Sequence, residues 1–124
     1  MLNTPTEETL NQLPGLYDTE FIALPDKLIH IHFFIGGDCD WYICEYDKEN
    51  LFFAFCILNG DLQNAEWGYV DFSELKAIKV GGWLEVNNDL YWDIRPALEV
   101  EKIRRAHNWP MPSLVSKRMN NITA

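Results

Sequence analysis

The sequence predicts an α+β fold. We expect a meander of five to six mostly antiparallel strands, as a sheet or partly open roll, with an N-terminal helix, a short inserted helix and a C-terminal helix. Three observations lead to this prediction. The chain has 124 residues, of which 48% are hydrophobic, which suits one domain with a substantial core. Short apolar runs alternate with turn signals along most of its length. The chain is too short for repeated strand–helix–strand crossovers, so a doubly wound parallel sheet is excluded.

The first predicted element is a short helix near the N-terminus. Thr4 fits the N-cap position of a capping box, Pro5 the first helical position and Glu7 the residue that reaches back to the cap. The dipeptide Pro14-Gly15 ends the helix.

The central part of the chain is predicted to form strands. The run Leu51–Leu58 is apolar on both faces, as in the middle strand of a sheet that is covered on both sides. Asn59-Gly60 is a strong hairpin signal, because Asn and Gly accept positive φ angles. A second hairpin is expected around Asn87-Asn88. The predicted strands are Leu28–Ile35, Trp41–Tyr46, Leu51–Leu58, Glu66–Phe72, Trp83–Val86 and Leu90–Ile94.

Two further helices are predicted after the strands begin. A short one spans Ser73–Ile78, and Pro96 opens a longer one over Pro96–His107. We expect residues 1–108 to form a single α+β domain. Residues 109–124 are expected to form a basic, flexible C-terminal tail.

Charge is distributed unevenly along the chain. All 19 acidic residues precede residue 102 and are accompanied there by five basic residues, which gives a net charge of −14. Residues 102–124 carry five basic residues and no acid. We expect the acidic body to repel nucleic acid, so direct nucleic-acid binding should be weak or absent.

The sequence also predicts the compartment. The longest apolar run, Leu51–Leu58, has eight residues and is too short to cross a bilayer. The N-terminus lacks the basic start and apolar stretch of a secretory signal. The three cysteines, Cys39, Cys44 and Cys56, include no Cys-x-x-Cys pair. We therefore expect a cytoplasmic protein with reduced thiols, and we expect it neither to contact a membrane nor to use a cofactor.

Aromatic residues lie at alternating positions of several predicted strands, with acidic residues as neighbours, so some rings must face outward. Aromatic anchors rimmed by acids suit a basic protein partner better than they suit nucleic acid. The same pattern is also produced by core rings beside acids that only aid solubility. The candidate partner-binding residues are Asp38, Asp40, Trp41, Glu45, Glu66, Trp67 and Tyr69.

The sequence also offers weaker candidates for chemistry. His30 and His32 are two residues apart on a predicted strand and could share a metal ion, although the spacing specifies no third ligand. Cys39 is the most exposed thiol expected, but no spacing pairs it with a histidine. The glycine pairs Gly36-Gly37 and Gly81-Gly82 lack the flanking residues of a phosphate loop.

Several consecutive blocks resemble a bacterial family, domain-of-unknown-function family 2958, over roughly residues 10–103. The resemblance implies a small protein carried by plasmids, phages or integrative elements, often near anti-restriction and conjugation genes. It supplies no catalytic or binding residues. The blocks are Leu13–Glu20, His32–Phe34, Trp41-Tyr42, Glu45–Asp47, Leu51–Phe53, Ile57–Leu62, Ala65–Tyr69, Phe72–Leu75 and Asp89–Trp92.

Together these observations favour a non-enzymatic protein-binding factor of a mobile element. Its partner is expected to be a basic, nucleic-acid-binding protein, and the sharpest form of the hypothesis is inhibition of a host defence protein. One alternative is a metal-dependent hydrolase that uses His30 and His32. Another is a nucleic-acid accessory factor that acts through the basic C-terminal residues Arg104, Arg105, Lys117 and Arg118.

Overall fold

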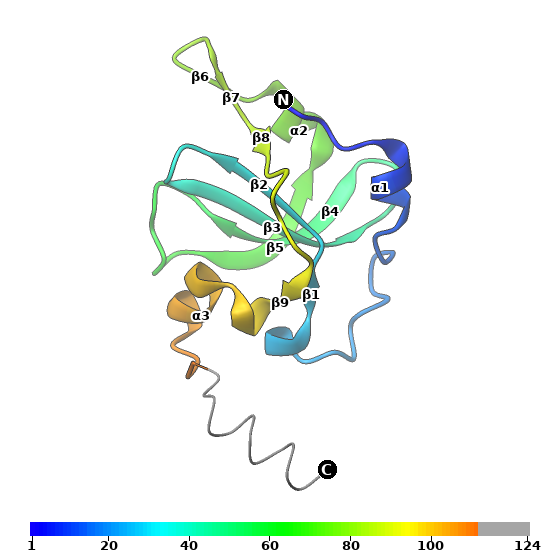
Figure 1. The fold of residues 1–124 in the computed structure, drawn as a ribbon, viewed down its shortest axis with the longest axis vertical. Helices are drawn as coiled ribbons and strands as arrows, with labels where there is room; N and C mark the ends of the chain where they lie inside the picture. Colours follow the sequence, from blue (N-terminus) through cyan, green and yellow to red (C-terminus); the bar gives the residue numbers. More distant parts are fainter. Residues whose placement is uncertain (112–124) are drawn as a thin grey trace, which may run out of the picture.

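The computed structural model describes residues 1–111 and shows an open, antiparallel five-stranded sheet in the order β5-β4-β3-β2-β8 (Figure 1). Helices flank the sheet, so the predicted α+β class is confirmed. The strands of this sheet are β2 (Ile31–Ile35), β3 (Cys39–Tyr46), β4 (Leu51–Ile57), β5 (Glu66–Asp71) and β8 (Asn87–Asn88).

Shorter elements complete the described part of the chain. Two small ladders pair β1 (Leu28–Ile29) with β9 (Arg95–Pro96) and β6 (Lys79–Val80) with β7 (Leu84–Glu85). The α-helices are α1 (Glu7–Asn11), α2 (Phe72–Ala77) and α3 (Glu101–His107), and the 3-10 turns are η1 (Leu24–Asp26) and η2 (Ala97–Glu99). No helix within residues 1–111 is long and apolar enough to cross a membrane.

Both faces of the sheet are covered. One core cluster includes Phe33 and Phe52 and packs under α1 and α2, whereas the other includes Phe55 and Ile103 and packs under η2 and α3. In Figure 1, α3 and β9 lie below the sheet, and α1 lies beside its right-hand end. Strand β4 contributes to both clusters, which confirms the prediction of a central strand that is apolar on both faces. We call the side under α3 the α3 face.

A register shift in β3 determines which side chains reach the α3 face. Ile43 pairs with Ala54 and Glu45 pairs with Phe53, so Cys44 is an extra residue in its strand. Such a β-bulge places two successive side chains on one face. As a result Cys44, which lies in the core cluster of the α3 face, is followed on that face by Glu45, opposite Phe53.

The turn predictions are partly confirmed. Asn59 and Gly60 have φ angles of 54° and 67° and form the expected hairpin turn. The predicted hairpin around Asn87-Asn88 is wrong, because these residues form β8 and pair with Phe34 and Phe33 of β2. The buried Val86 and the backbone hydrogen bonds of this segment to Leu2 hold it extended, which overrides the turn preference of asparagine. Residues 90–94 form no strand.

Two helix boundaries and one strand also differ from the predictions. The N-cap of α1 is Thr6, whose hydroxyl accepts a hydrogen bond from the Thr9 N–H at 3.2 Å, rather than Thr4. The predicted helix Pro96–His107 is interrupted at Val100, which is buried and extended between η2 and α3. The alternation predicted from Leu28 to Ile35 is broken at His30, because Ile29 and Ile31 lie in different core clusters.

Candidate functional site

The structure separates the predicted partner-binding residues. Asp38, Glu66 and Tyr69 are exposed and Trp67 is half-buried. Trp41 is only 5% exposed and lies in the core under α1 and α2, so its ring is not available to a partner. Asp40 and Glu45 are buried as well, and each belongs to a separate polar site on the α3 face.

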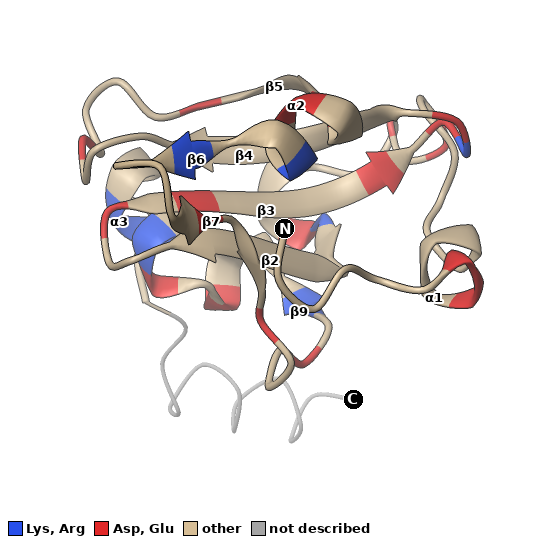
Figure 2. Cartoon of the chain, turned by 90° about the horizontal axis from the view of Figure 1, so that it is seen from above, with Lys and Arg blue, Asp and Glu red and all other residues tan. Residues whose placement is uncertain are grey.

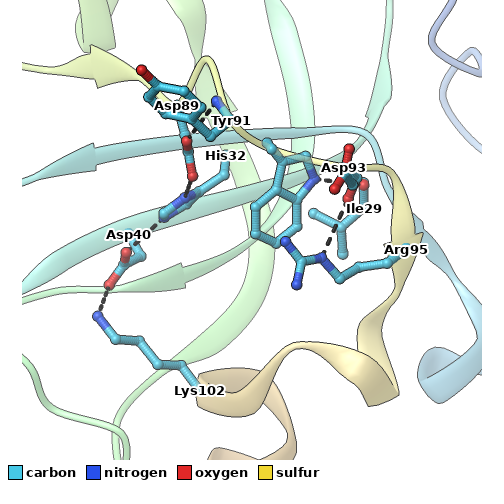
Figure 3. Close-up of polar contacts among 9 residues, drawn as sticks. Ile29, His32, Asp40, Asp89, Tyr91, Asp93, Arg95 and Lys102 are labelled. Atoms are coloured by element: carbon cyan, nitrogen blue, oxygen red, sulfur yellow. Dashed lines mark hydrogen bonds and ion pairs between the residues drawn. The ribbon is translucent and has the colours of Figure 1, made fainter.

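The first polar site is a chain of charged groups centred on His32. Its Nε2 lies 2.7 Å from Asp40 Oδ1, and its Nδ1 lies 3.0 Å from Asp89 Oδ2. The Lys102 ammonium of α3 donates to Asp40 Oδ2 at 2.7 Å and to the Gly37 carbonyl at 3.0 Å. Figure 3 shows this series running from Lys102 through Asp40 and His32 to Asp89. Both ring nitrogens of His32 therefore face carboxylate oxygens, which are hydrogen-bond acceptors when the acids are ionised.

Aromatic rings pack against His32 at the centre of this chain, which we call the His32 network. Tyr42 stacks on His32 with a centroid separation of 4.6 Å, and Trp92 lies 5.2 Å away. Burial alone would raise the pKa of Asp40, but hydrogen bonds and charge from His32 and Lys102 lower it below its usual value. Burial, together with the Asp40 charge, raises the pKa of Tyr42. Each charged group already has a partner within the fold, so the network holds α3 and the segment around Asp89 against the sheet.

The structure gives little support to a shared site for His30 and His32. Burial and the Lys48 charge lower the pKa of His30, whereas His32 has both ring nitrogens on carboxylates. Within residues 1–111, no group of three or more His, Cys, Asp or Glu side chains is arranged to hold a metal ion.

The second polar site is built around Glu45, at the other end of β3. Glu45 Oε1 accepts from the Tyr17 N–H at 3.0 Å, and Oε2 accepts from the Thr19 N–H at 3.1 Å. The Thr19 hydroxyl also donates to Oε2. Glu45 therefore holds the loop of residues 15–23 over the end of the sheet.

Lys27 is the second buried charge of this site. Only 6% of it is exposed, and its ammonium donates to the Thr19 carbonyl and, at 2.9 Å, to the Thr19 hydroxyl. The Thr19 hydroxyl therefore bridges the Lys27 ammonium and the Glu45 carboxylate. The Lys27 Nζ also lies 6.0 Å from the centre of the Phe53 ring.

These residues line a pocket of about 220 Å³, which we call the Glu45 pocket. Its rim contains two exposed rings, Tyr17 at 63% and Tyr69 at 53% exposure. A hydrogen bond with Tyr17 raises the pKa of Tyr69. The lining residues are Tyr17, Glu20, Lys27, Glu45, Phe53 and Tyr69.

The surroundings of the Glu45 pocket are apolar and acidic. The neighbouring loop exposes Phe21, Ile22 and Leu24, and Phe21 is 94% exposed. Lys27 is the only Lys or Arg before Lys48, and its ammonium is linked to Glu45 through the Thr19 hydroxyl. Figure 2 shows acidic residues over most elements, whereas the basic residues of regular elements are confined to α2, β6, β9 and α3. The exposed acid Glu20 therefore leaves the pocket with a net negative charge.

A larger hollow of about 420 Å³ lies between α1 and α2 but offers less to a ligand. Its Lys48 ammonium donates to the Leu13 carbonyl, and its Lys76 ammonium lies 4.4 Å from the centre of the Phe72 ring. Its rings, Tyr46 and Phe72, are buried.

Glu45 and Tyr69 are predicted from the sequence, whereas Tyr17, Thr19, Glu20 and Lys27 are not. The missed residues lie in a segment without periodicity, where a large apolar pair, Phe21-Ile22, interrupts a polar loop. An apolar pair in a polar loop is the one local signal that could have pointed to this surface.

Comparison with known proteins gives one match. The model of a family described as "Protein of unknown function (DUF2958)" matches residues 23–107. No significant match is found among the curated proteins or the solved structures. The matched range includes β1 to α3, and with them the whole His32 network and the Lys27 and Glu45 side of the pocket.

Proposed function

The chain belongs to the DUF2958 family, and we propose that it is a non-enzymatic protein-binding factor that receives a basic side chain of its partner in the Glu45 pocket. The observation that carries the proposal is the coincidence of exposed rings and an unbalanced acid around one pocket. Tyr17 and Tyr69 form its rim, and Glu20 supplies a carboxylate that the fold does not bury.

The chemistry of the pocket favours a cation. Aromatic faces attract ammonium and guanidinium groups, and a carboxylate beside them adds a charged acceptor. Residues 1–111 carry nineteen acidic and eight basic residues, so the long-range field also attracts a basic surface. Arginine fits better than lysine, because its planar group can stack on Tyr69 while donating to Glu20.

The exposed apolar side chains favour a protein over a small solute. Phe21, Ile22 and Leu24 lie outside the pocket and extend the apolar area next to its rim. Interfaces combine such apolar anchors with a charged rim. We propose, as the finer form of this function, that the partner is a nucleic-acid-handling protein in the cytoplasm. Occupation of its basic surface would inhibit it on behalf of a mobile element.

The basic C-terminal residues support an alternative less well. Lys102 is bound to Asp40, and the Arg104 guanidinium donates to the Leu98 carbonyl at 3.1 Å. Lys117 and Arg118 lie outside the described residues.

The proposal is tested by capturing partners from the native host with the wild-type protein and with the double variant Glu20→Gln, Tyr69→Ala. We expect the double variant to lose a basic protein that the wild type retains. A matched control, Glu8→Gln, removes one exposed acid from α1 and should retain that protein.

Association kinetics with the captured protein then test the electrostatic part. The association rate of the wild type should fall by about tenfold or more from low to physiological salt, and Glu20→Gln should weaken this dependence. The proposed function would be refuted if the double variant retained the same partner and its association rate did not depend on salt.

A further inference from the structure

Strand β5 has an open edge beside the Glu45 pocket. It is the last strand in the order β5-β4-β3-β2-β8, and no strand within residues 1–111 pairs with its outer side. Tyr69 belongs both to this strand and to the rim of the pocket.

The register identifies the backbone groups on the open edge. The Phe72 N–H donates to the Asn50 carbonyl at 2.7 Å, and Val70, Gly68 and Glu66 follow at two-residue intervals opposite β4. Antiparallel ladders alternate between bonded and non-bonded pairs, so the residues between these point their backbone groups outward. The outward N–H groups belong to Trp67, Tyr69 and Asp71 and have no hydrogen-bond partner in the described chain.

The acidic charge at this edge determines which kind of segment can pair with β5. Glu66 and Asp71 lie at the two ends of β5. An antiparallel second copy would bring Glu66 of one chain close to Asp71 of the other, and it would join two acidic bodies. A basic extended segment would instead be attracted by the carboxylates of Glu66 and Asp71.

We propose that β5 accepts an extended segment of a basic partner as an additional antiparallel strand. The partner residue opposite Tyr69 would have its side chain on the same face as the Tyr69 ring, about 5 Å away between Cβ atoms. An arginine there would lie at the mouth of the Glu45 pocket. Backbone hydrogen bonds would then supply affinity, and the alternate side chains would supply specificity. This inference rests on the proposed function and specifies how the partner binds.

The test uses a synthetic peptide, acetyl-Thr-Arg-Val-Arg-Val-Arg-Thr-amide, whose arginines all fall on one face of a strand. The matched control peptide carries citrulline, the neutral isostere of arginine, at the three positions. NMR titration gives the affinities, and hydrogen exchange gives the protection of individual amides. We expect the arginine peptide to bind about tenfold more tightly or better, and to slow exchange of the Trp67, Tyr69 and Asp71 amides about tenfold. Gly68 and Val70, whose amides face β4, are internal controls.

Two variants isolate the backbone contribution. Tyr69→Ala removes the ring and keeps the outward N–H, whereas Tyr69→Pro removes both. Proline is tolerated on an edge strand where its missing N–H faced solvent. We expect the Pro variant to bind the arginine peptide about tenfold more weakly than the Ala variant. Exchange in the wild type gives an independent result if the Pro variant does not fold.

Peptide binding that leaves the outward amides unprotected would overturn edge addition and leave the pocket as the binding site. Absence of binding at millimolar arginine peptide would overturn edge addition too. In both cases the capture experiment above decides the proposed function separately.

Discussion

Two buried carboxylates on the same strand, Asp40 and Glu45, lie at opposite ends of the α3 face and have different surroundings. Asp40 is bonded to side chains from β2 and α3, and its partner His32 stacks on Tyr42. Glu45 is bonded to the backbone and hydroxyl of a loop, and its pocket opens between exposed rings. A buried charge alone therefore does not mark a binding site. The two sites differ in whether side chains of the fold itself fill the space around the carboxylate.

The largest expected effect on stability comes from breaking the His32 network. Asp40→Ala removes the buried acceptor that His32 and the partly exposed Lys102 share. We expect the free energy of unfolding to fall by about 3 kcal/mol, because Asp40 accepts two side-chain hydrogen bonds and a hydrogen bond to a charged group contributes about 1.5 to 3 kcal/mol. Urea unfolding measures the change, and Asp38→Ala, an exposed acid two residues earlier, should change it by less than about 0.5 kcal/mol. Equal effects of the two substitutions would show that the network does not hold α3.

A smaller and more local effect on stability is expected at the Glu45 pocket. Glu45→Ala removes the acceptor for the Tyr17 and Thr19 N–H groups. Loss of these hydrogen bonds should cost about 2 kcal/mol or less, and hydrogen exchange at those two amides should accelerate. The exposed Glu49 in the following turn provides the control Glu49→Ala. Unchanged exchange at Tyr17 and Thr19 would contradict the assigned role of Glu45.

Acid should lower the stability of the folded protein through Asp40 of the His32 network. The pKa of Asp40 is lower in the folded protein than its usual value, so the unfolded chain binds a proton at Asp40 more readily. The stabilisation is therefore present above about pH 4 and is lost as the pH falls further. Unfolding measured from pH 6 to pH 2 should show a steeper loss of stability for the wild type than for Asp40→Ala. Parallel curves would be inconsistent with this linkage.

The smallest expected effect concerns Cys44, which lies between the two sites on β3. Burial raises its pKa to about 12, and burial likewise raises the pKa of Cys56 to about 11. At neutral pH we expect a maleimide reagent to label Cys39 first and the other two thiols slowly. Glu45→Ala should accelerate labelling of Cys44 at denaturant concentrations that leave the protein folded. Rapid labelling of all three thiols in the wild type would conflict with the burial of β3 and β4.

Local chemistry explains which parts of the fold were predictable from the sequence. The apolar faces of β4 and the turn at Asn59-Gly60 depend on neighbouring residues, and both are confirmed. The strand at Asn87-Asn88 was mispredicted, because its conformation is fixed by contacts with Leu2 and β2.

The candidate site was predictable only in part for the same reason. Glu45 and Tyr69 stood out as an acid and a ring on strands. Their site is completed by Thr19, which is 26 residues from Glu45 and eight from Lys27. The bulge at Cys44, which directs Glu45 to the α3 face, has no signal in the sequence. Contacts across such separations follow from the folded arrangement rather than from a local pattern.

The comparison is tested most directly by measuring stability and peptide affinity for one variant of each site. Lys102→Met breaks the ion pair to Asp40, and Glu20→Gln neutralises the exposed acid of the Glu45 pocket. We predict that Lys102→Met lowers the free energy of unfolding by about 1 kcal/mol and leaves the affinity for the arginine peptide unchanged. We predict that Glu20→Gln leaves stability unchanged and weakens the peptide about fivefold. Weakened binding in Lys102→Met with unaltered binding in Glu20→Gln would contradict the assignment of one site to the fold and the other to a partner.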